Sequence, residues 1–277
     1  MSRQVLVVGE PSEPEFQTVT SWLASRAQVT CVKSATEACE TFADGRTPEL
    51  IVFVQSRPGQ SPTASVERLH RMWPLARLVL LLGSWCEGET RNGRPGPGVW
   101  RIFWYDFARR FGPVFDGDDS LLISWNMPRL ASEGERLLGD LSANLKPGNG
   151  LVSIATYFKE TYEFLASACH AIGYVTDWYR SDDVPKPSQA IAGIWDARRG
   201  DNNEWSQIER FARSIAPASV LVTQSFPRIE DWQQAAHCGV NLIAKPFQLP
   251  DLWRALGNCS EVAGPGPNCP PLVNCST

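Results

Sequence analysis

Three polar side chains in the second half of the sequence each come at the end of an apolar run. Asp196 ends "AIAGIWD", Thr223 ends "SVLVT", and Lys245 follows "VNLIA". If these runs are parallel strands, their carboxyl ends meet at one edge of a sheet, where ligands bind. A carboxylate, a hydroxyl and an ammonium group at that edge suit an aspartyl-phosphate. The carboxylate would be the nucleophile, and the other two groups would hold phosphoryl oxygens.

The elements that must position these groups alternate between strand-like and helix-like patterns. Apolar runs bounded by Gly or polar residues alternate with segments that have apolar residues at helical spacing, which is typical of parallel βαβ units. We therefore predict an α/β fold with two doubly wound, parallel five-stranded sheets in tandem, of flavodoxin-like arrangement. The ten expected strands are 4–10, 27–32, 49–55, 77–83, 99–107, 151–156, 174–179, 190–196, 219–223 and 240–244.

The order of elements in the first half returns in the second half. "GVWRIFWYDF" occupies the place of "GVNLIAKPF", which indicates an internal duplication. We expect an irregular, exposed loop at 83–98, because its Gly and Pro content disfavours a helix. The predicted organisation is a first domain at 1–110, a linker at 111–149, a second domain at 150–256, and a disordered Gly/Pro/Cys tail at 257–277. Within the linker we expect a short helix near 132–141.

Composition argues against several classes of protein. The net charge of −4 argues against a nucleic-acid binder, which normally has a basic surface. No apolar stretch reaches 18 residues and the start does not resemble a signal peptide, so we expect a cytoplasmic protein without a membrane segment. The eight cysteines form no CxxC pair and the three histidines are isolated, so we expect no structural metal.

The second half resembles the receiver (CheY-like) domain of bacterial response regulators. The resemblance rests on "AGIWDARRG", "VLVT" and "AAHCGVNLIAKPF", covers roughly 150–256, and extends more weakly to 3–110. It implies that Asp196 is the phospho-acceptor position and that Thr223 is the switch hydroxyl. It also implies that Lys245 reaches the phosphoryl group and that the bond from Lys245 to Pro246 is cis.

The second half departs from the family where a metal would bind. A working receiver has an acidic pair after its first strand to hold Mg²⁺, and here these positions are Ala155 and Thr156. One carboxylate, Asp196, is a poor site for Mg²⁺. Asp182 or Asp183 is an alternative second carboxylate, but no spacing requires it. Asp196 could also be a structural residue that caps a turn or pairs with Arg198.

The first half departs further and resembles a pseudo-receiver, a fold without its chemistry. Alignment of "ELIVFVQSRPG" with the family's third strand places Val54 at the acceptor position, and valine cannot accept a phosphoryl group. The other expected counterparts are Gly9 and Glu10 for the acidic pair, Gly83 for the hydroxyl, and Tyr105 and Asp106 for Lys-Pro.

The eleven tryptophans suggest one candidate surface for a protein partner. Trp85, Trp100 and Trp104 lie in or near the Gly/Pro loop and could form an exposed aromatic patch, although aromatic residues also build cores.

These features favour a non-enzymatic signalling adaptor that acts through protein contacts and needs no cofactor. Its expected partners are other signalling proteins, such as a histidine kinase or a second copy of this chain. A phosphorelay regulator modified at Asp196 by a histidine kinase, with Mg²⁺, is the first alternative. A nucleotide-binding α/β enzyme is the second, but the sequence has no GxGxxG after a strand, no P-loop and no nucleophile elbow.

Overall fold

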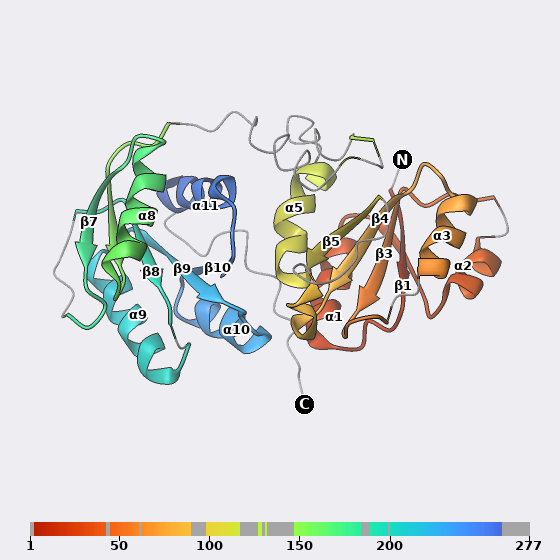
Figure 1. Ribbon diagram of the computed structural model, residues 1–277, viewed down its shortest axis with the longest axis horizontal. Helices are drawn as coiled ribbons and strands as arrows, with labels where there is room; N and C mark the ends of the chain where they lie inside the picture. Colours follow the sequence, from red (N-terminus) through yellow and green to blue (C-terminus); the bar gives the residue numbers. More distant parts are fainter. Residues whose placement is uncertain are drawn as a thin grey trace. The chain divides into compact units, whose positions relative to one another are not determined.

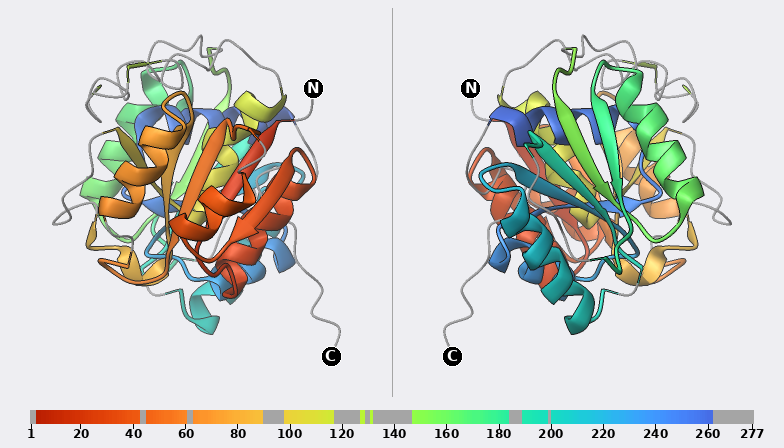
Figure 2. Two further views of the ribbon diagram at one scale, coloured as in Figure 1. Left: turned by 90° about the vertical axis from the view of Figure 1, so that its right-hand side faces the viewer. Right: turned by 90° about the vertical axis from the view of Figure 1, so that its left-hand side faces the viewer.

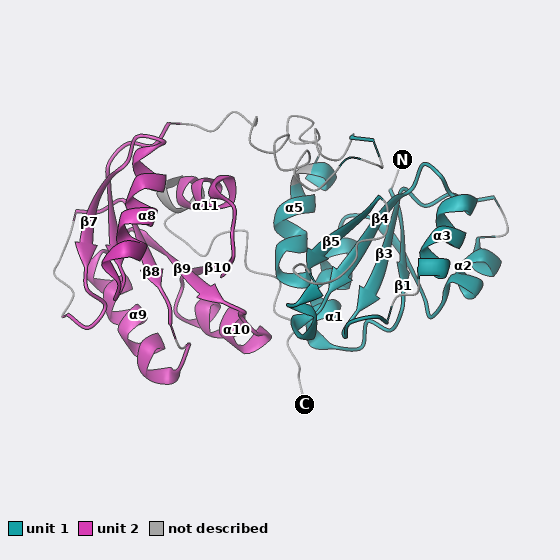
Figure 3. Ribbon diagram, viewed as in Figure 1, with its two compact units in different colours: residues 1–143, 270–277 teal, residues 144–269 magenta. Residues whose placement is uncertain are grey.

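The computed structural model describes residues 3–42, 45–60, 63–89, 98–116, 127–128, 131, 147–183, 189–198 and 200–261. The chain divides into two compact units, one of residues 1–143 with 270–277 and one of residues 144–269 (Figure 3). Each unit contains its own parallel sheet, and each is described by itself below.

The first unit is a five-stranded parallel sheet in the order β2-β1-β3-β4-β5. Helices α1 and α5 cover one face, where Trp22 packs edge-on against Phe107, and α2 and α3 cover the other (Figure 1). The elements are β1 Gln4–Val8, α1 Pro14–Ala24, β2 Gln28–Val32, α2 Ala35–Thr41, β3 Leu50–Gln55, α3 Thr63–Met72, β4 Arg77–Leu82, the 3₁₀ helix η1 Ser84–Cys86, β5 Val99–Phe103 and α5 Trp104–Asp116.

The second unit has the same topology, with the strand order β7-β6-β8-β9-β10. Helices α8 and α11 share a core on one face of the sheet, and α9 and α10 lie on the other (Figures 1 and 2). The elements are β6 Leu151–Ala155, α8 Lys159–His170, β7 Val175–Tyr179, β8 Ala192–Asp196, α9 Asn202–Ser214, β9 Ser219–Ser225, α10 Ile229–His237, β10 Asn241–Lys245 and α11 Leu249–Glu261.

The central strands explain why the sequence forms these sheets. Every residue of β3 and of β8 is buried, as expected for a strand covered by helices on both faces. Two of the helices, α2 and α9, begin at polar caps. The Ser34 side chain accepts from the Glu37 backbone N–H at the start of α2, and that of Asp201 accepts from the Glu204 backbone N–H at the start of α9. The predicted fold class, two flavodoxin-like parallel sheets in tandem, is confirmed.

The structure corrects the predicted strand at 99–107. It ends at Phe103, and α5 begins at Trp104, because Trp104, Phe107 and Phe111 recur at helical spacing and are all buried. The expected domain boundary at 110 therefore falls inside α5. The expected tail begins too early, since α11 continues to Glu261, and residues 262–277 lie outside the described part.

The predicted loop at 83–98 and the predicted linker are described only in part. Residues 84–86 of the loop form η1, so this portion is not irregular; Cys86 is buried, whereas Trp85 is exposed as predicted. Residues 90–97 and the predicted short helix near 132–141 lie outside the described residues.

Two other findings concern the described residues as a set. None of their helices combines the length and the apolar character that crossing a membrane requires. Cys31, Cys39, Cys86, Cys169 and Cys238 are free thiols, and burial raises the pKa of Cys86 to about 11 and that of Cys169 to about 12. Burial therefore favours the protonated form of both thiols at neutral pH.

Candidate functional site

Asp196 lies at the carboxyl edge of the second sheet, at the end of the buried strand β8. The strand register places it opposite Thr223 of β9, and Lys245 ends the next strand, β10. Thr156 follows the last residue of β6 on the other side of β8. The ends of β8 and β10, Thr223 near the end of β9, and the residue after β6 therefore bring Asp196, Thr223, Lys245 and Thr156 together.

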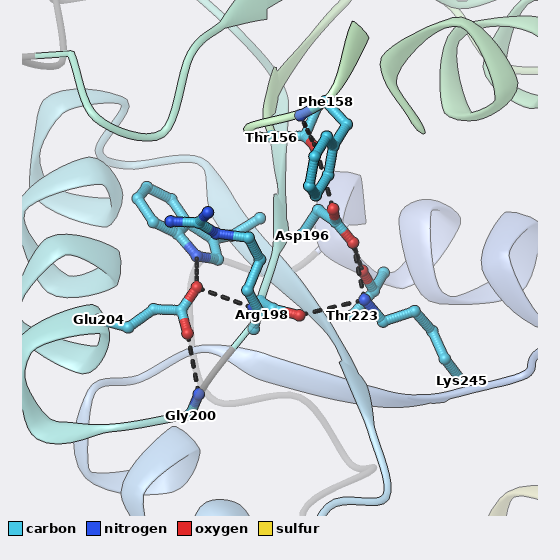
Figure 4. Close-up of polar contacts among 10 residues, drawn as sticks. Thr156, Phe158, Asp196, Arg198, Gly200, Glu204, Thr223 and Lys245 are labelled. Carbon is cyan, nitrogen blue, oxygen red and sulfur yellow. Dashed lines mark hydrogen bonds and ion pairs between the residues drawn. The ribbon is translucent and has the colours of Figure 1, made fainter. Parts of the chain in front are cut away.

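Both oxygens of the Asp196 carboxylate accept hydrogen bonds from these neighbours (Figure 4). Oδ1 accepts from Lys245 Nζ at 2.7 Å and from Thr223 Oγ1 at 3.3 Å, and Oδ2 accepts from Thr156 Oγ1 at 2.9 Å. Asp196 is only 5% exposed, so its charge is balanced mainly by the Lys245 ammonium. The structural alternative in which Asp196 pairs with Arg198 is wrong.

Lys245 is held in place by a second contact and by the chain that follows it. Its Nζ donates to the Ala197 carbonyl oxygen at 3.1 Å, one residue beyond Asp196. The peptide bond from Lys245 to Pro246 is cis. The ammonium group therefore bridges the end of β8 and the start of the loop after it.

Glu204, which the sequence analysis did not single out, fixes the loop after β8. Its buried carboxylate accepts from the backbone N–H groups of Arg198 at 2.9 Å and Gly200 at 2.8 Å, and from Trp195 Nε1 at 3.4 Å (Figure 4). The available signal was Asp201 three residues before Glu204, the spacing of a helix cap followed by an acid in the first turn. Glu204 thus fixes the start of the loop after Asp196.

The residues at this edge do not fit Mg²⁺. The metal is normally held by one or two carboxylates together with phosphate oxygens and water. Ala155 and Thr156 supply no carboxylate, and Asp182 lies within ion-pair distance of Arg180 and Arg198 instead. Within the described ranges, no three His, Cys, Asp or Glu side chains are grouped as metal ligands.

The first unit places apolar residues at the equivalent positions. Val54 pairs with Leu81 in the register, as Asp196 pairs with Thr223. Leu81, rather than the expected Gly83, is therefore the counterpart of the hydroxyl. Gly9 follows β1 as Thr156 follows β6, and a Cβ on Gly9, which has a φ of +119°, would lie 3.2 Å from Val54 Cβ.

The same register shifts the expected counterpart of Lys245. Leu82 pairs with Phe103, so the next residue, Trp104, takes the position of Lys245. The expected pair, Tyr105 and Asp106, lies one residue further along in α5. Burial strongly raises the pKa of Tyr105, and Asp106 forms an ion pair with Arg109. The remaining expected counterpart, Glu10, is exposed after Gly9.

A buried carboxylate does occur at this edge of the first unit, but it comes from α1. Glu15 accepts from the Ser84 hydroxyl at 2.6 Å and from the Ser84 backbone N–H at 3.2 Å. Trp104 Nε1 donates to the same hydroxyl at 3.2 Å. Burial raises the pKa of Glu15, and the Ser84 hydrogen bonds act against this rise. Sequence analysis missed Glu15, because it lies within an ordinary helix start.

The expected aromatic patch is not formed as predicted. Trp85 is 66% exposed, whereas Trp104 is 2% exposed and belongs to the core. Trp100 is half-buried and packs against Phe111 of α5. Burial of Trp104 therefore excludes a surface made by all three rings.

Comparisons with known proteins leave the family of the chain unassigned. No protein-family model matches the sequence, and no curated protein sequence matches it. The C-terminus of E. coli RcsC, with a linker region and a phosphoreceiver domain, is 13% identical with a TM-score of 0.32, over 92% of this chain and 91% of that chain. A putative two-component system response regulator/GGDEF domain protein is 7% identical with a TM-score of 0.32, over 92% and 98%. Tagatose-6-phosphate ketose/aldose isomerase from Escherichia coli is 12% identical with a TM-score of 0.27, over 93% and 81%.

Proposed function

We propose that this chain is a non-enzymatic signalling adaptor in which two receiver-like units act through protein contacts. The observation that carries this proposal is the state of Asp196. Its carboxylate is buried, its charge is balanced by Lys245, and a threonine hydroxyl stands where a second carboxylate would be needed for Mg²⁺. Phosphoryl transfer to a carboxylate depends on such a metal to neutralise the developing charge.

The first unit supports the same proposal. Val54 and Leu81 present no nucleophile and no hydroxyl at its equivalent edge, and Trp104 replaces the cation. The proposed partners are other signalling proteins of the cytoplasm, a histidine kinase or a second copy among them. No cofactor is required by this function.

The proposal is tested by incubating the full chain with acetyl phosphate and Mg²⁺ and measuring its intact mass. We expect no phosphoryl adduct in the wild type and none in Asp196→Asn. A stoichiometric adduct in the wild type that is lost in Asp196→Asn would overturn the proposal.

That result would instead establish the alternative, a phosphorelay regulator. The observation that favours this alternative is the convergence of Asp196, Thr223 and Lys245, which are the acceptor, hydroxyl and cation of such a site. It predicts Mg²⁺-dependent quenching of Trp195, the residue before Asp196, and transfer from a phosphorylated histidine kinase to Asp196.

A further inference from the structure

Several exposed aromatic and arginine side chains surround the end of β6 in the second unit. Tyr157 and Phe158 form the loop between β6 and α8, Trp178 and Arg180 lie at the end of β7, and Arg198 follows β8. We call these five residues the aromatic–arginine surface. Phe158 is 50% exposed and Trp178 is 39% exposed, so both rings are accessible to a partner.

The two arginines are ordered by stacking on one ring. The guanidinium carbons of Arg198 and Arg180 lie 4.2 Å and 4.7 Å from the centroid of the Tyr157 ring. Stacking fixes the planes of the guanidinium groups, so less conformational entropy is lost when they bind an anion. The backbone of Arg198 is further held by its N–H bond to the buried Glu204.

Among the described residues, a single carboxylate lies within ion-pair distance of the two guanidinium groups. One carboxylate, Asp182, lies 3.9 Å from Arg180 and 3.8 Å from Arg198, longer than a direct hydrogen bond in both cases. Its side chain is 50% exposed, so water weakens both ion pairs. Two guanidinium groups that share one distant carboxylate leave room for a carboxylate from a partner.

The apolar part of the surface is connected to Asp196 through hydrogen bonds to Thr156. Trp178 Nε1 donates to the Thr156 carbonyl oxygen at 3.2 Å, and the Phe158 N–H donates to the Thr156 hydroxyl at 3.4 Å. That hydroxyl donates to Asp196. Trp178 also stacks on Tyr162 of α8, with ring centroids 5.5 Å apart and planes 17° apart. The rings are therefore held in position before any partner binds.

We propose that the aromatic–arginine surface binds an acidic segment of a partner protein, with a carboxylate on Arg180 and Arg198 and an apolar side chain against Phe158 and Trp178. Tyr, Trp and Arg are the residues that contribute most to protein interfaces, and here they are adjacent and preordered. This proposal rests on the adaptor function proposed above and identifies the class of partner for its second unit.

The test uses a phage-displayed library of random 12-residue peptides, selected on the full chain and counter-selected on Arg180→Gln/Arg198→Gln. We expect enrichment of sequences that combine Asp or Glu with aromatic or large aliphatic residues. A fluorescein-labelled copy of a selected peptide should bind the double Gln variant at least about tenfold more weakly by fluorescence anisotropy. Selection of peptides without acidic residues, or equal binding by the double Gln variant, would overturn the proposal.

Two further variants test whether peptide binding needs the stacked guanidinium groups or only their charge, and whether any exposed arginine would serve. Arg180→Lys/Arg198→Lys keeps both charges but loses the stacked planes, so its affinity should fall between those of the wild type and the double Gln variant. Arg213→Gln removes an exposed arginine of α9 that pairs with Glu209, and it should bind like the wild type. Equal losses in Arg213→Gln and in the double Gln variant would refute a localised site.

The outcome is distinguishable from failure of the adaptor function itself. An acetyl-phosphate adduct on Asp196 together with an intact preference for acidic peptides would contradict the non-catalytic function and support the binding surface. Absence of both an adduct and peptide binding would contradict the binding surface and support the non-catalytic function.

Discussion

The ion pair between Asp196 and Lys245 should contribute to the stability of the second unit. Asp196 is almost fully buried, and Lys245 is its charged partner at 2.7 Å. Removing one member of a buried pair leaves an uncompensated charge, which costs more than the pair itself contributes. Lys245→Met should therefore lower the free energy of unfolding by about 3 kcal/mol in urea denaturation of the full chain.

Two comparison variants make this prediction specific. Asp196→Asn/Lys245→Met should be more stable than Lys245→Met alone, because the buried charge is then gone. Lys159→Met removes an exposed lysine that pairs with Glu163 on the surface of α8, and it should change stability by less than about 0.5 kcal/mol. A Lys245→Met variant as stable as Lys159→Met would contradict the importance of the buried pair.

The Glu15 carboxyl gives the first unit a defined dependence on pH. Burial raises its pKa in the folded chain above 4.5, its ordinary value. As pH rises, the unfolded chain therefore loses this proton before the folded chain does. The stability contributed by the group is fully present below its unfolded pKa and is lost as pH rises through the raised pKa.

Glu15→Gln removes this titration, so the free energy of unfolding of the variant should rise relative to the wild type as pH increases from about 4.5 to neutral. A series of urea denaturations across this range measures the difference. If the difference between the two proteins is constant across the series, the carboxyl does not have the raised pKa that its burial implies.

At the scale of the elements, hydrophobic pattern predicted the strands better than their ends. β3 and β8 are continuous apolar runs buried on both faces, and both were predictable from sequence. Ile102, Phe103 and Trp104 pass from β5 into α5 without a charged residue, Gly or Pro between them, so pattern alone could not place the boundary at Trp104. That uncertainty shifted the expected counterpart of Lys245 to Tyr105.

Site residues were predictable where a strand ended in a polar side chain. Asp196 and Lys245 follow from strand ends and from the topology of a parallel sheet; Thr223 lies opposite Asp196 as expected, although β9 continues beyond the predicted end to Ser225. Glu15 and Glu204 lie in the first turns of helices, where acids are common for reasons unrelated to any site. Their roles depend on contacts with loops that sequence spacing does not specify.

The connection after β4 is shaped by Gly83, whose lack of a side chain admits the Glu15 carboxylate. A Cβ at this position would lie 2.3 Å from Glu15 Oε1 and 2.8 Å from Phe16 Cζ. Gly83→Ala should therefore lower the free energy of unfolding by about 1–3 kcal/mol, as overpacking of a core does. Gly88→Ala, in the same connection, has no atom within 4 Å of its new Cβ and should be tolerated. Equal stability of the two variants in thermal denaturation would show that Glu15 moves away freely.

Across the whole molecule, the same topology carries different chemistry in its two units. Both sheets have the order in which the second strand lies at one edge and the fifth at the other. The second unit keeps a carboxylate, two hydroxyls and a cation at the carboxyl edge, whereas the first has Val54, Leu81 and Trp104 there. A single substitution in the second unit would therefore add a second carboxylate beside Asp196, whereas the first unit has no carboxylate at the position of Asp196.

Thr156→Asp makes that one change, since it would place a second carboxylate beside Asp196, where the Thr156 hydroxyl now donates at 2.9 Å. Two carboxylates at this distance repel each other unless a cation binds, so the variant should be less stable than the wild type in EDTA and should regain stability in millimolar Mg²⁺. Thermal denaturation of the full chain with and without Mg²⁺ measures this response. Thr156→Asn, of similar size but neutral, should not respond to Mg²⁺.

Val54→Asp in the first unit should be destabilised in both conditions, because Leu81 and Trp104 offer its buried carboxylate neither a hydroxyl nor a cation. A Mg²⁺ response in the wild type equal to that of Thr156→Asp would show that Asp196 already binds the metal without a second carboxylate at position 156.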